Sequence, residues 1–448
     1  MPRRYLPTII LTLIGLAVAA MWVPREQAAV AEHLAGFPDA DPTAHQLRPV
    51  VLAVLCFLPA LGGLLYGLAG TMARYVARQF LGLLGLCFVA LLVIWLLIDF
   101  QDNLNEFQKS AQPFRMMGEL YAAQFPEIFI TLIPYALLLS LLFCLGRLSA
   151  SREIIAMIQT GRGLARVTTP FLVTGLLATL FSMGLNYQWA PASTATEQRV
   201  MNSINGQDAS LTKPFIFRNP RVRRTWMVQS FPPDFSKGAP LRNVRVVQEN
   251  DDASLKSMLT ANEAVWDGSA KTWTFSGAVL RHLNGSEAPR FDHDLPEPYV
   301  VSGWRETPAE IVQPGLPAYQ LGIPDLVGWL KGGSRGDRAR DTHRTQWHHR
   351  FSQPFNCLIM VLLATPLGVV FSRRGTSSGV ALAIFLSAGL LFATTIFLTL
   401  GDSGHLPPVL AAWLPNIIFG MLAIILFRRR LAGRPIYQTI RRILPSES

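Results

Sequence analysis

Charged residues are scarce in this chain of 448 residues. Asp, Glu, Lys and Arg together make up only 15% of it, whereas 50% is hydrophobic, and the mean hydropathy is +0.30. This balance excludes an ordinary soluble protein and indicates a protein that crosses a membrane several times. The net charge of +11 is also typical of nucleic-acid-binding proteins, so the distribution of charge along the chain has to decide between the two classes.

Cysteine is also rare. The four cysteines all lie inside apolar runs, and none falls in the polar middle section; they are Cys56, Cys87, Cys144 and Cys357. The sequence has no CxxC pair, which argues against a disulfide framework and against a redox or metal motif of that type. We expect the four thiols to act as small buried hydrophobic groups.

Motifs for catalysis and nucleotide binding are missing too. No GxxxxGK[ST] loop occurs, so the chain is not itself an ATPase, and any ATP-driven function requires a separate subunit. GDSGH (401–405) contains the Gly-Asp-Ser-Gly of chymotrypsin-like proteases, but it lies in a short turn between apolar runs, without the β-barrel context. Adjacent His348 and His349 diverge by about 100° on a helix and cannot share a metal ion. We predict no catalytic residue, no metal ligand and no cofactor.

Long apolar runs are abundant instead. Eight are long enough to span a bilayer as helices, which takes about 20 residues. They are 6–23, 49–70, 79–99, 128–146, 169–189, 354–372, 379–400 and 409–427. Arg3, Arg4 and the pair Ala17 and Ala19 also fit a signal peptide over the first run, and either interpretation places residues 25–47 outside. The spans are nearly empty of ionisable groups, which argues against a membrane enzyme.

The charges between the spans predict the orientation. The positive-inside rule places the N-terminus in the cytoplasm, because the segments that are then inside carry most of the arginines near the spans. These are Arg3, Arg4, Arg74, Arg78, Arg147, Arg152, Arg162, Arg166, Arg373, Arg374, Arg428, Arg429, Arg430, Arg434, Arg441 and Arg442. The short loops that are then outside are acidic, with Glu26, Glu32, Asp39, Asp41, Asp99, Asp102, Glu106, Glu119 and Glu127. Both termini are expected in the cytoplasm, and the basic charge needs no nucleic acid.

One long polar section, 191–350, falls outside the membrane. It contains short β-rich runs such as RTWMVQSF (224–231) and KTWTFSGAVLRHL (271–283), with the turn signals DGSA and NGSE between runs. The section predicts an antiparallel β domain of sandwich or jelly-roll type. The expected fold is a polytopic helical membrane protein with this domain inserted. Its parts are 1–72 (two extra spans), 73–190 (three spans), 191–350 (β domain), 351–430 (three spans) and 431–448 (a basic tail).

The stretch GRLSASREIIAMIQTGRG (146–163) lies between two spans on the predicted cytoplasmic side. Ser149 or Ser151 suits a helix start, and Gly161 or Gly163 suits its end. Ile154, Ile155, Met157 and Ile158 form an apolar face. One interpretation is a helix that lies on anionic headgroups, and the pattern alone favours it. The other is a helix, within 147–168, that docks into a soluble partner and pairs Glu153 with an arginine of that partner.

Several stretches occur together in a specific order. They are RYVARQFL (74–81), LLIDFQDNLNEF (96–107), FITLIPYALLLSLLFCLGRLSASREIIAMIQTGRG (129–163), WAPASTATEQR (189–199), ANEAVWDGSAKTWTFSGAV (261–279), HHRFSQPFNCLIMVLLATPLGVVFSRRG (348–375) and LPPVLAAWLPNIIF (406–419). In this order, residues 73–430 resemble the lipopolysaccharide-export permeases of the LptF/LptG family, also called YjgP/YjgQ. The resemblance is greater to the LptG half.

The resemblance implies a transmembrane permease subunit of an ABC-type exporter in the bacterial inner membrane. It implies a second permease half, a cytoplasmic LptB-like ATPase dimer, and LptC- and LptA-like proteins that receive lipopolysaccharide from a periplasmic β domain. It reverses the preference at 146–163 in favour of a coupling helix. The coupling residues would then be Glu153, Arg152, Ile154 and Met157.

The substrate path implied by the resemblance runs between spans 79–99 and 379–400 and into the β domain. Candidate residues along it are Asp99, Asp102, Trp226, Trp266 and Trp273; the tryptophans fit a β-domain core as well as a lipid groove. Some LptG-type members carry lysines where this sequence has Asp99, Asp102 and Glu106, with Lys109 and Arg115 only further on. The lipid therefore need not be a standard lipopolysaccharide. The alternative function is a membrane scaffold whose β domain binds envelope partners without transport.

Overall fold

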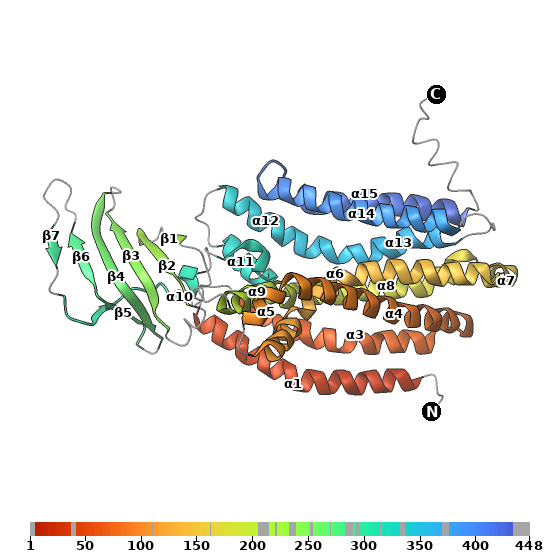
Figure 1. Cartoon of the computed structure of the whole chain (residues 1–448), viewed down its shortest axis with the longest axis horizontal. Coiled ribbons are helices and arrows are strands. Elements are labelled where there is room, and N and C mark those ends of the chain that lie inside the picture. Colours follow the sequence, from red (N-terminus) through yellow and green to blue (C-terminus); the bar gives the residue numbers. More distant parts are fainter. Residues whose placement is uncertain are drawn as a thin grey trace, which may run out of the picture.

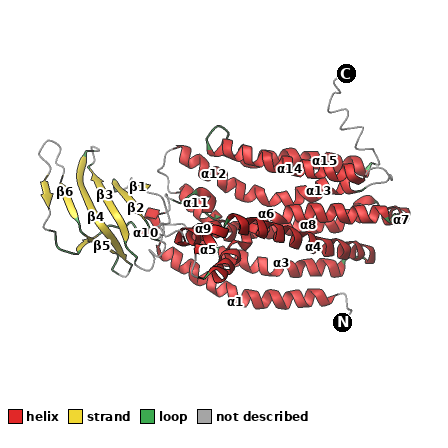
Figure 2. Cartoon of the chain, viewed as in Figure 1, coloured by secondary structure: helices red, strands yellow, loops and turns green. Residues whose placement is uncertain are grey.

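The chain folds into a long bundle of helices with a β sheet beyond one end (Figures 1 and 2). The structure, a computed structural model, describes residues 5–36, 42–109, 112–161, 163–204, 215–219, 222–232, 239–250, 254–268, 270–282, 290–292, 295–312, 316–331, 337–369 and 376–432. Within these residues α1 begins, and α15 ends, at the end of the bundle that is farthest from the sheet (Figure 1).

Helices precede and follow the sheet along the chain. Before it come α1 (Leu6–Gly36), α2 (Pro42–Gln46), α3 (Arg48–Leu68), α4 (Thr71–Asp102), α5 (Leu104–Lys109), α6 (Pro113–Ala150), α7 (Glu153–Gln159), α8 (Leu164–Tyr187) and α9 (Trp189–Ile204). After it come α10 (Pro308–Val312), the 3-10 helix η4 (Ala318–Gln320), α11 (Ile323–Lys331), α12 (Asp337–Ser352), the 3-10 helix η5 (Gln353–Phe355), α13 (Asn356–Gly368), α14 (Thr376–Asp402) and α15 (Pro408–Leu431).

Eight helical segments of the described chain are long and apolar enough to cross a membrane, which confirms the predicted fold class. They are Leu6–Leu34, Pro42–Leu68, Thr71–Asp102, Pro113–Ala150, Leu164–Tyr187, Arg340–Gly368, Gly379–Asp402 and Pro408–Leu431. Most helices extend beyond the apolar runs that predicted them. The longest, α6, continues through polar residues at both ends and through Pro126 and Pro134, because spans tolerate proline where neighbouring helices satisfy the backbone.

The core of the bundle lies around α6 and α13. Of the most apolar stretch of α6, 72% is buried, compared with 6% for α4 and 17% for the segment of α14. Gly368 of α13 lies so close to α6 that a Cβ atom there would be 3.0 Å from the Cβ of Leu145. Phe80 of α4 and Phe171 of α8 meet edge to face with ring centroids 5.0 Å apart. These contacts join α4, α6, α8 and α13 into one packed unit. Within it α4 is the most exposed, and α14 is also largely exposed.

The first two spans form a hairpin that packs against α8 through α3. Small residues allow the close approach: a Cβ on Gly15 of α1 would be 2.5 Å from the carbonyl oxygen of Cys56 in α3. A Cβ on Gly184 of α8 would be 2.4 Å from a methyl group of Leu55. Backbone proximity at small residues is how helices associate in a bilayer, where lipid tails remove the hydrophobic driving force.

The described residues of the β domain form one antiparallel sheet. Its strands are β1 (Phe215–Asn219), β2 (Arg224–Ser230), β3 (Leu241–Glu249), β4 (Leu255–Asp267), β5 (Thr272–Ser276), β6 (Val279–His282), β7 (Arg290–Asp292) and β8 (Tyr299–Ser302). The order is β1-β2-β3-β4-β5-β8, and β6 pairs with β4 and β7. The sheet branches at the long strand β4: its residues Glu263–Asp267 pair with β5, and its residues Ser257–Thr260 pair with β6.

Alternate residues of the strands point into one apolar core, as a half-buried strand requires. Trp226, Phe231, Trp273 and Phe275 are fully buried there. Ile311 of α10 joins this core, so a helix closes it from the side of the bundle. The antiparallel β region is confirmed, and a jelly-roll fold, which requires two sheets, stays a prediction. The predicted range 191–350 encloses the sheet, and the structure has helices α9 and α10–α12 in its flanking parts.

Candidate functional site

The short helix α7 lies between α6 and α8, at the end of the bundle farthest from the sheet (Figure 1). The chain makes a sharp turn before it, because Arg152 has a left-handed backbone conformation with φ of 57°. It turns again after it at Gly161, whose φ of 82° is easily adopted only by glycine. The two turns hold α7 as a separate helix, shorter than the segment 147–168 that the sequence predicted.

Glu153, the first residue of α7, joins two segments of the bundle. Its Oε2 accepts a hydrogen bond of 2.9 Å from the hydroxyl of Tyr75 in α4. Its Oε1 accepts one of 2.9 Å from the hydroxyl of Ser151. Ser151 therefore orients the carboxylate of Glu153 and does not cap α7, whose N-cap residue is Arg152. The carboxylate is half-buried at the surface and is held in position by neutral hydroxyl groups.

The apolar residues of α7 divide between two faces. Ile154 is 1% exposed and Met157 is 5% exposed, and both belong to the core formed with α4, α6, α8 and α13. Ile155 is 37% exposed, and Ala156, Gln159 and Arg152 are exposed beside it. The side chains of Ile154 and Met157 are buried within the chain, and the coupling role predicted for them stays a prediction. Ile155 occupies the outward position instead.

A group of carboxylates lies near the opposite end of the bundle, where α4, α6 and α9 meet. Asp99 of α4 is half-buried and Asp102 is exposed. Glu127 of α6 accepts hydrogen bonds from the hydroxyls of Ser193 (3.3 Å) and Thr194 (2.6 Å) in α9.

Glu197 of α9 adds a further carboxylate to this group. Burial raises its pKa, and the charges of Glu127 and Asp99 raise it further, against a hydrogen bond from Gln124. Glu197 lies in the stretch WAPASTATEQR, and no local pattern marks it as part of a site. Only the packing of α9 on α6 brings its carboxylate near the other acids.

The tryptophans proposed for a lipid groove lie in or beside the sheet core. Trp226 and Trp273 are fully buried, with ring centroids 4.9 Å apart. The indole Nε1 of Trp273 donates to the backbone oxygen of Glu306 at 2.8 Å. These two side chains support the sheet core, which is one of the two roles that the sequence left open for them. Trp266, half-buried at 5.3 Å from Trp273, keeps an exposed part.

Trp304 is another aromatic residue that the sequence analysis did not single out. The guanidinium carbon of Arg224 lies over its ring, 4.1 Å from the centroid. Arg224 also forms a buried ion pair of 2.7 Å with Glu306. Burial lowers the pKa of Arg224, and the charge of Glu306 opposes that effect.

The outer faces of α4 and α14 expose large apolar side chains. Leu86 of α4 is 68% exposed, and Phe385 and Phe392 of α14 are 73% and 69% exposed. Faces of this kind are covered by lipid or by another protein in a membrane. They belong to the two helices that contain the spans 79–99 and 379–400, which the sequence analysis had singled out.

This arrangement of spans, sheet and spans occurs in a sequence that is similar to known proteins. The sequence model of the family described as "Lipopolysaccharide export system permease LptF/LptG" matches residues 74–429. The chain belongs to the LptF/LptG family. The family prediction is confirmed, and with it a permease subunit that crosses the inner membrane several times.

Curated relatives of this LptF/LptG chain agree. It is 23% identical over 361 residues to the lipopolysaccharide export system permease protein LptF of Escherichia coli strain K12, covering 79% of this chain and 93% of the relative. The LptF protein of Shigella flexneri matches to the same extent. The family description covers both halves, so the LptG-like assignment stays a prediction. The matched region begins in α4, so α1, α2 and α3 precede the part shared with the LptF/LptG family.

Proposed function

We propose that this chain is one permease half of an ATP-driven exporter, which extracts lipopolysaccharide or a related glycolipid from the inner membrane and passes it to a periplasmic bridge. The observation that carries the proposal is the family match across both sets of spans and the sheet between them. The charge asymmetry of the loops supports cytoplasmic termini and a periplasmic sheet, and both termini of the bundle lie at the end that carries α7 (Figure 1).

The ATPase would dock at α7. The outward-facing residues Arg152, Ile155 and Gln159 supply the contact surface, and Glu153 supplies a carboxylate for a cation of the partner. The hydrogen bond from Tyr75 to Glu153 links this surface to α4. A movement of the ATPase would therefore shift α7 together with α4 as packed elements, the usual form of such transitions. The buried Ile154 and Met157 transmit the movement to the bundle core.

The lipid would travel between this chain and a second permease half. The exposed apolar faces of α4 and α14 suit acyl chains or the facing helices of that second half. The half-buried carboxylates Asp99, Glu127 and Glu197 at the periplasmic end disfavour direct contact with phosphate groups. A substrate contact there would instead involve sugar hydroxyls or a bridging divalent cation. The sheet then passes the lipid to LptC- and LptA-like partners.

Co-purification with the host's LptB-like ATPase tests the proposal. We expect the wild-type chain to retain the ATPase and Glu153→Lys to lose most of it, because the variant places a cation where the partner's cation binds. Glu119→Lys is the matched control: Glu119 is exposed on α6, in a surface pair with Arg115, and lies near the other end of the bundle.

Two results would contradict the proposal. If the wild-type chain retains no ATPase, the chain acts as a scaffold. If Glu153→Lys and Glu119→Lys lower retention of the ATPase equally, the loss reflects the change in net charge of the chain and not docking at α7. A normal detergent-solubilised yield and melting temperature for Glu153→Lys exclude misfolding as the cause.

A further inference from the structure

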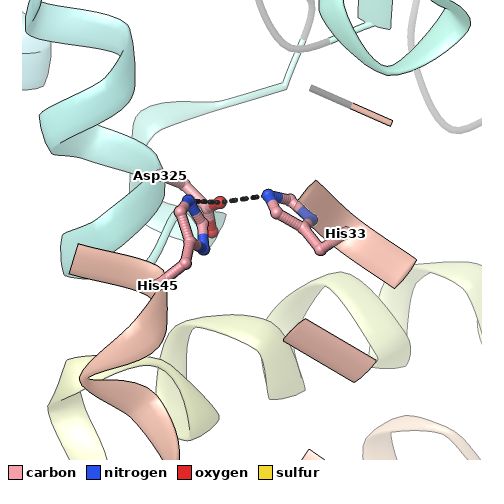
Figure 3. Close-up of side chains that lie close together, drawn as sticks. All are labelled: His33, His45 and Asp325. Atoms are coloured by element: carbon pink, nitrogen blue, oxygen red, sulfur yellow. Dashed lines mark ion pairs between the residues drawn. The ribbon is translucent and has the colours of Figure 1, made fainter. Parts of the chain in front are cut away.

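Three side chains with metal-binding atoms lie close together (Figure 3). His33 comes from the last turn of α1, His45 from α2 and Asp325 from the first turn of α11. The Nε2 atoms of His33 and His45 lie 3.6 Å and 3.9 Å from Oδ1 of Asp325. One ligand atom from each residue lies within 4.8 Å of both others.

The two separations from Oδ1 of Asp325 are close to those between ligand atoms of a tetrahedral ion. Zinc holds nitrogen and oxygen ligands at about 2.0–2.1 Å, which places the ligand atoms of a tetrahedron about 3.3 Å apart and those of an octahedron about 2.9 Å apart. The observed separations from Asp325 exceed the tetrahedral value by a few tenths of an ångström. Small rotations of the imidazole rings, whose centroids are 4.4 Å apart, would close that difference.

The surroundings hold these ligands in place. His45 is only 3% exposed, and the Asp325 side chain is 14% exposed. The amide Nε2 of Gln188 donates to Oδ2 of Asp325 at 3.2 Å, which leaves Oδ1 facing the histidines. A hydrogen bond from a neighbouring side chain to a ligating carboxylate is a usual feature of metal sites. Gly322 permits this arrangement, because a Cβ there would overlap the side chain of Gln188.

The local charge also suits a divalent cation. Arg48 lies nearby, but its guanidinium forms an ion pair of 2.6 Å with Glu26. Two neutral imidazoles and one carboxylate carry a net charge of −1, so the site with a divalent ion bound would carry a net charge of +1. The hydroxyl of Tyr187 donates to the backbone oxygen of Ala44 at 2.7 Å and so fixes α2 beside the bundle.

We propose that His33, His45 and Asp325 bind one zinc ion, or another divalent transition metal that takes the same ligands. The ion links α1 and α2 of the N-terminal segment to α11. Its two histidines come from the segment before the matched family region, and its aspartate comes from within that region. Three protein ligands leave a fourth position for water. The sequence analysis predicted no metal ligand, because the three residues form no local motif.

Metal titration of the full-length chain, purified in detergent without a polyhistidine tag and after chelation, tests the proposal. We expect one zinc per chain by elemental analysis, and a visible absorption band of tetrahedral type when Co²⁺ replaces zinc. His45→Gln and Asp325→Asn should each weaken zinc binding at least tenfold. Gln188→Ala, which removes only the partner of the ligating carboxylate, should weaken it by about 10–100-fold. His405→Gln is the control, because His405 is exposed and lies outside the cluster.

The melting temperature gives a second readout that does not depend on transport. Zinc should raise the melting temperature of the wild-type chain and of His405→Gln, and should leave His45→Gln unchanged. A wild-type chain that binds no zinc, or variants that bind it as tightly as wild type, would overturn the proposal. The three residues would then form only a hydrogen-bonded contact between the hairpin and α11. None of these results depends on whether the chain binds an ATPase.

Discussion

Two neighbouring isoleucines of α7 provide a test of how this helix is used. Ile154 is 1% exposed and Ile155 is 37% exposed, although the sequence places both on one apolar stretch. Replacing Ile154 with alanine removes three buried carbon groups, a transfer term of about 2.4 kcal/mol at about 0.8 kcal/mol for each. The cavity left in a packed core adds to this term, and isoleucine-to-alanine changes of this kind cost about 2–5 kcal/mol.

Ile155→Ala should behave in the opposite way. Its side chain already meets solvent, so the loss of stability should stay below about 1 kcal/mol. Under the proposed function the same change removes an apolar contact with the ATPase. We therefore expect Ile155→Ala to weaken retention of the ATPase without lowering the melting temperature. Ile154→Ala should lower the melting temperature, and it should weaken retention only as far as the fold of α7 is lost.

The assay compares thermal unfolding in detergent with ATPase co-purification for the two variants, prepared side by side. Equal destabilisation by both changes would refute the burial argument, because it would mean that α7 packs with a different face inward. A stable Ile155→Ala variant that retains the ATPase fully would refute the docking face while leaving the burial argument intact.

Two further predictions concern the sheet and the carboxylates. Arg224→Ala should destabilise the β domain by about 3–5 kcal/mol, because it removes the ion-pair partner of Glu306, whose side chain is 2% exposed. Arg218→Ala, which breaks a pair between the exposed Arg218 and Glu249, should cost less than about 1 kcal/mol. Limited proteolysis of the sheet measures both effects, and faster cleavage of Arg218→Ala than of Arg224→Ala would contradict the argument. The raised pKa of Glu197 means that the folded chain binds a proton there more tightly than the unfolded chain, so stability should fall as the pH rises through the Glu197 pKa. Glu197→Gln should remove that part of the pH dependence, and an unchanged profile of melting temperature against pH would contradict it.

Local properties of the sequence determined the eight spans and the β region of this protein. Membrane insertion depends on hydropathy over about 20 consecutive residues, and strands depend on short β-rich runs between turns. The sequence also predicts a role for Glu153, because it is the lone acid among arginines in a short segment between two spans, and that role stays a prediction. The same local pattern predicted a segment longer than α7, and it placed Ile155 on one apolar face with the buried Ile154 and Met157.

Only the tertiary structure decided which face of α7 is buried, because helices from distant parts of the sequence, α4 and α13, complete the core in which Ile154 and Met157 lie. Packing also decided that Trp226 and Trp273 support the sheet core, since the β strands that carry them meet only through the fold. The convergence of His33, His45 and Asp325 needs three separate helices, and Asp325 is almost 300 positions from His33 in the chain. Hydropathy and spacing act over a few turns of helix, whereas these contacts arise from how whole helices pack against one another.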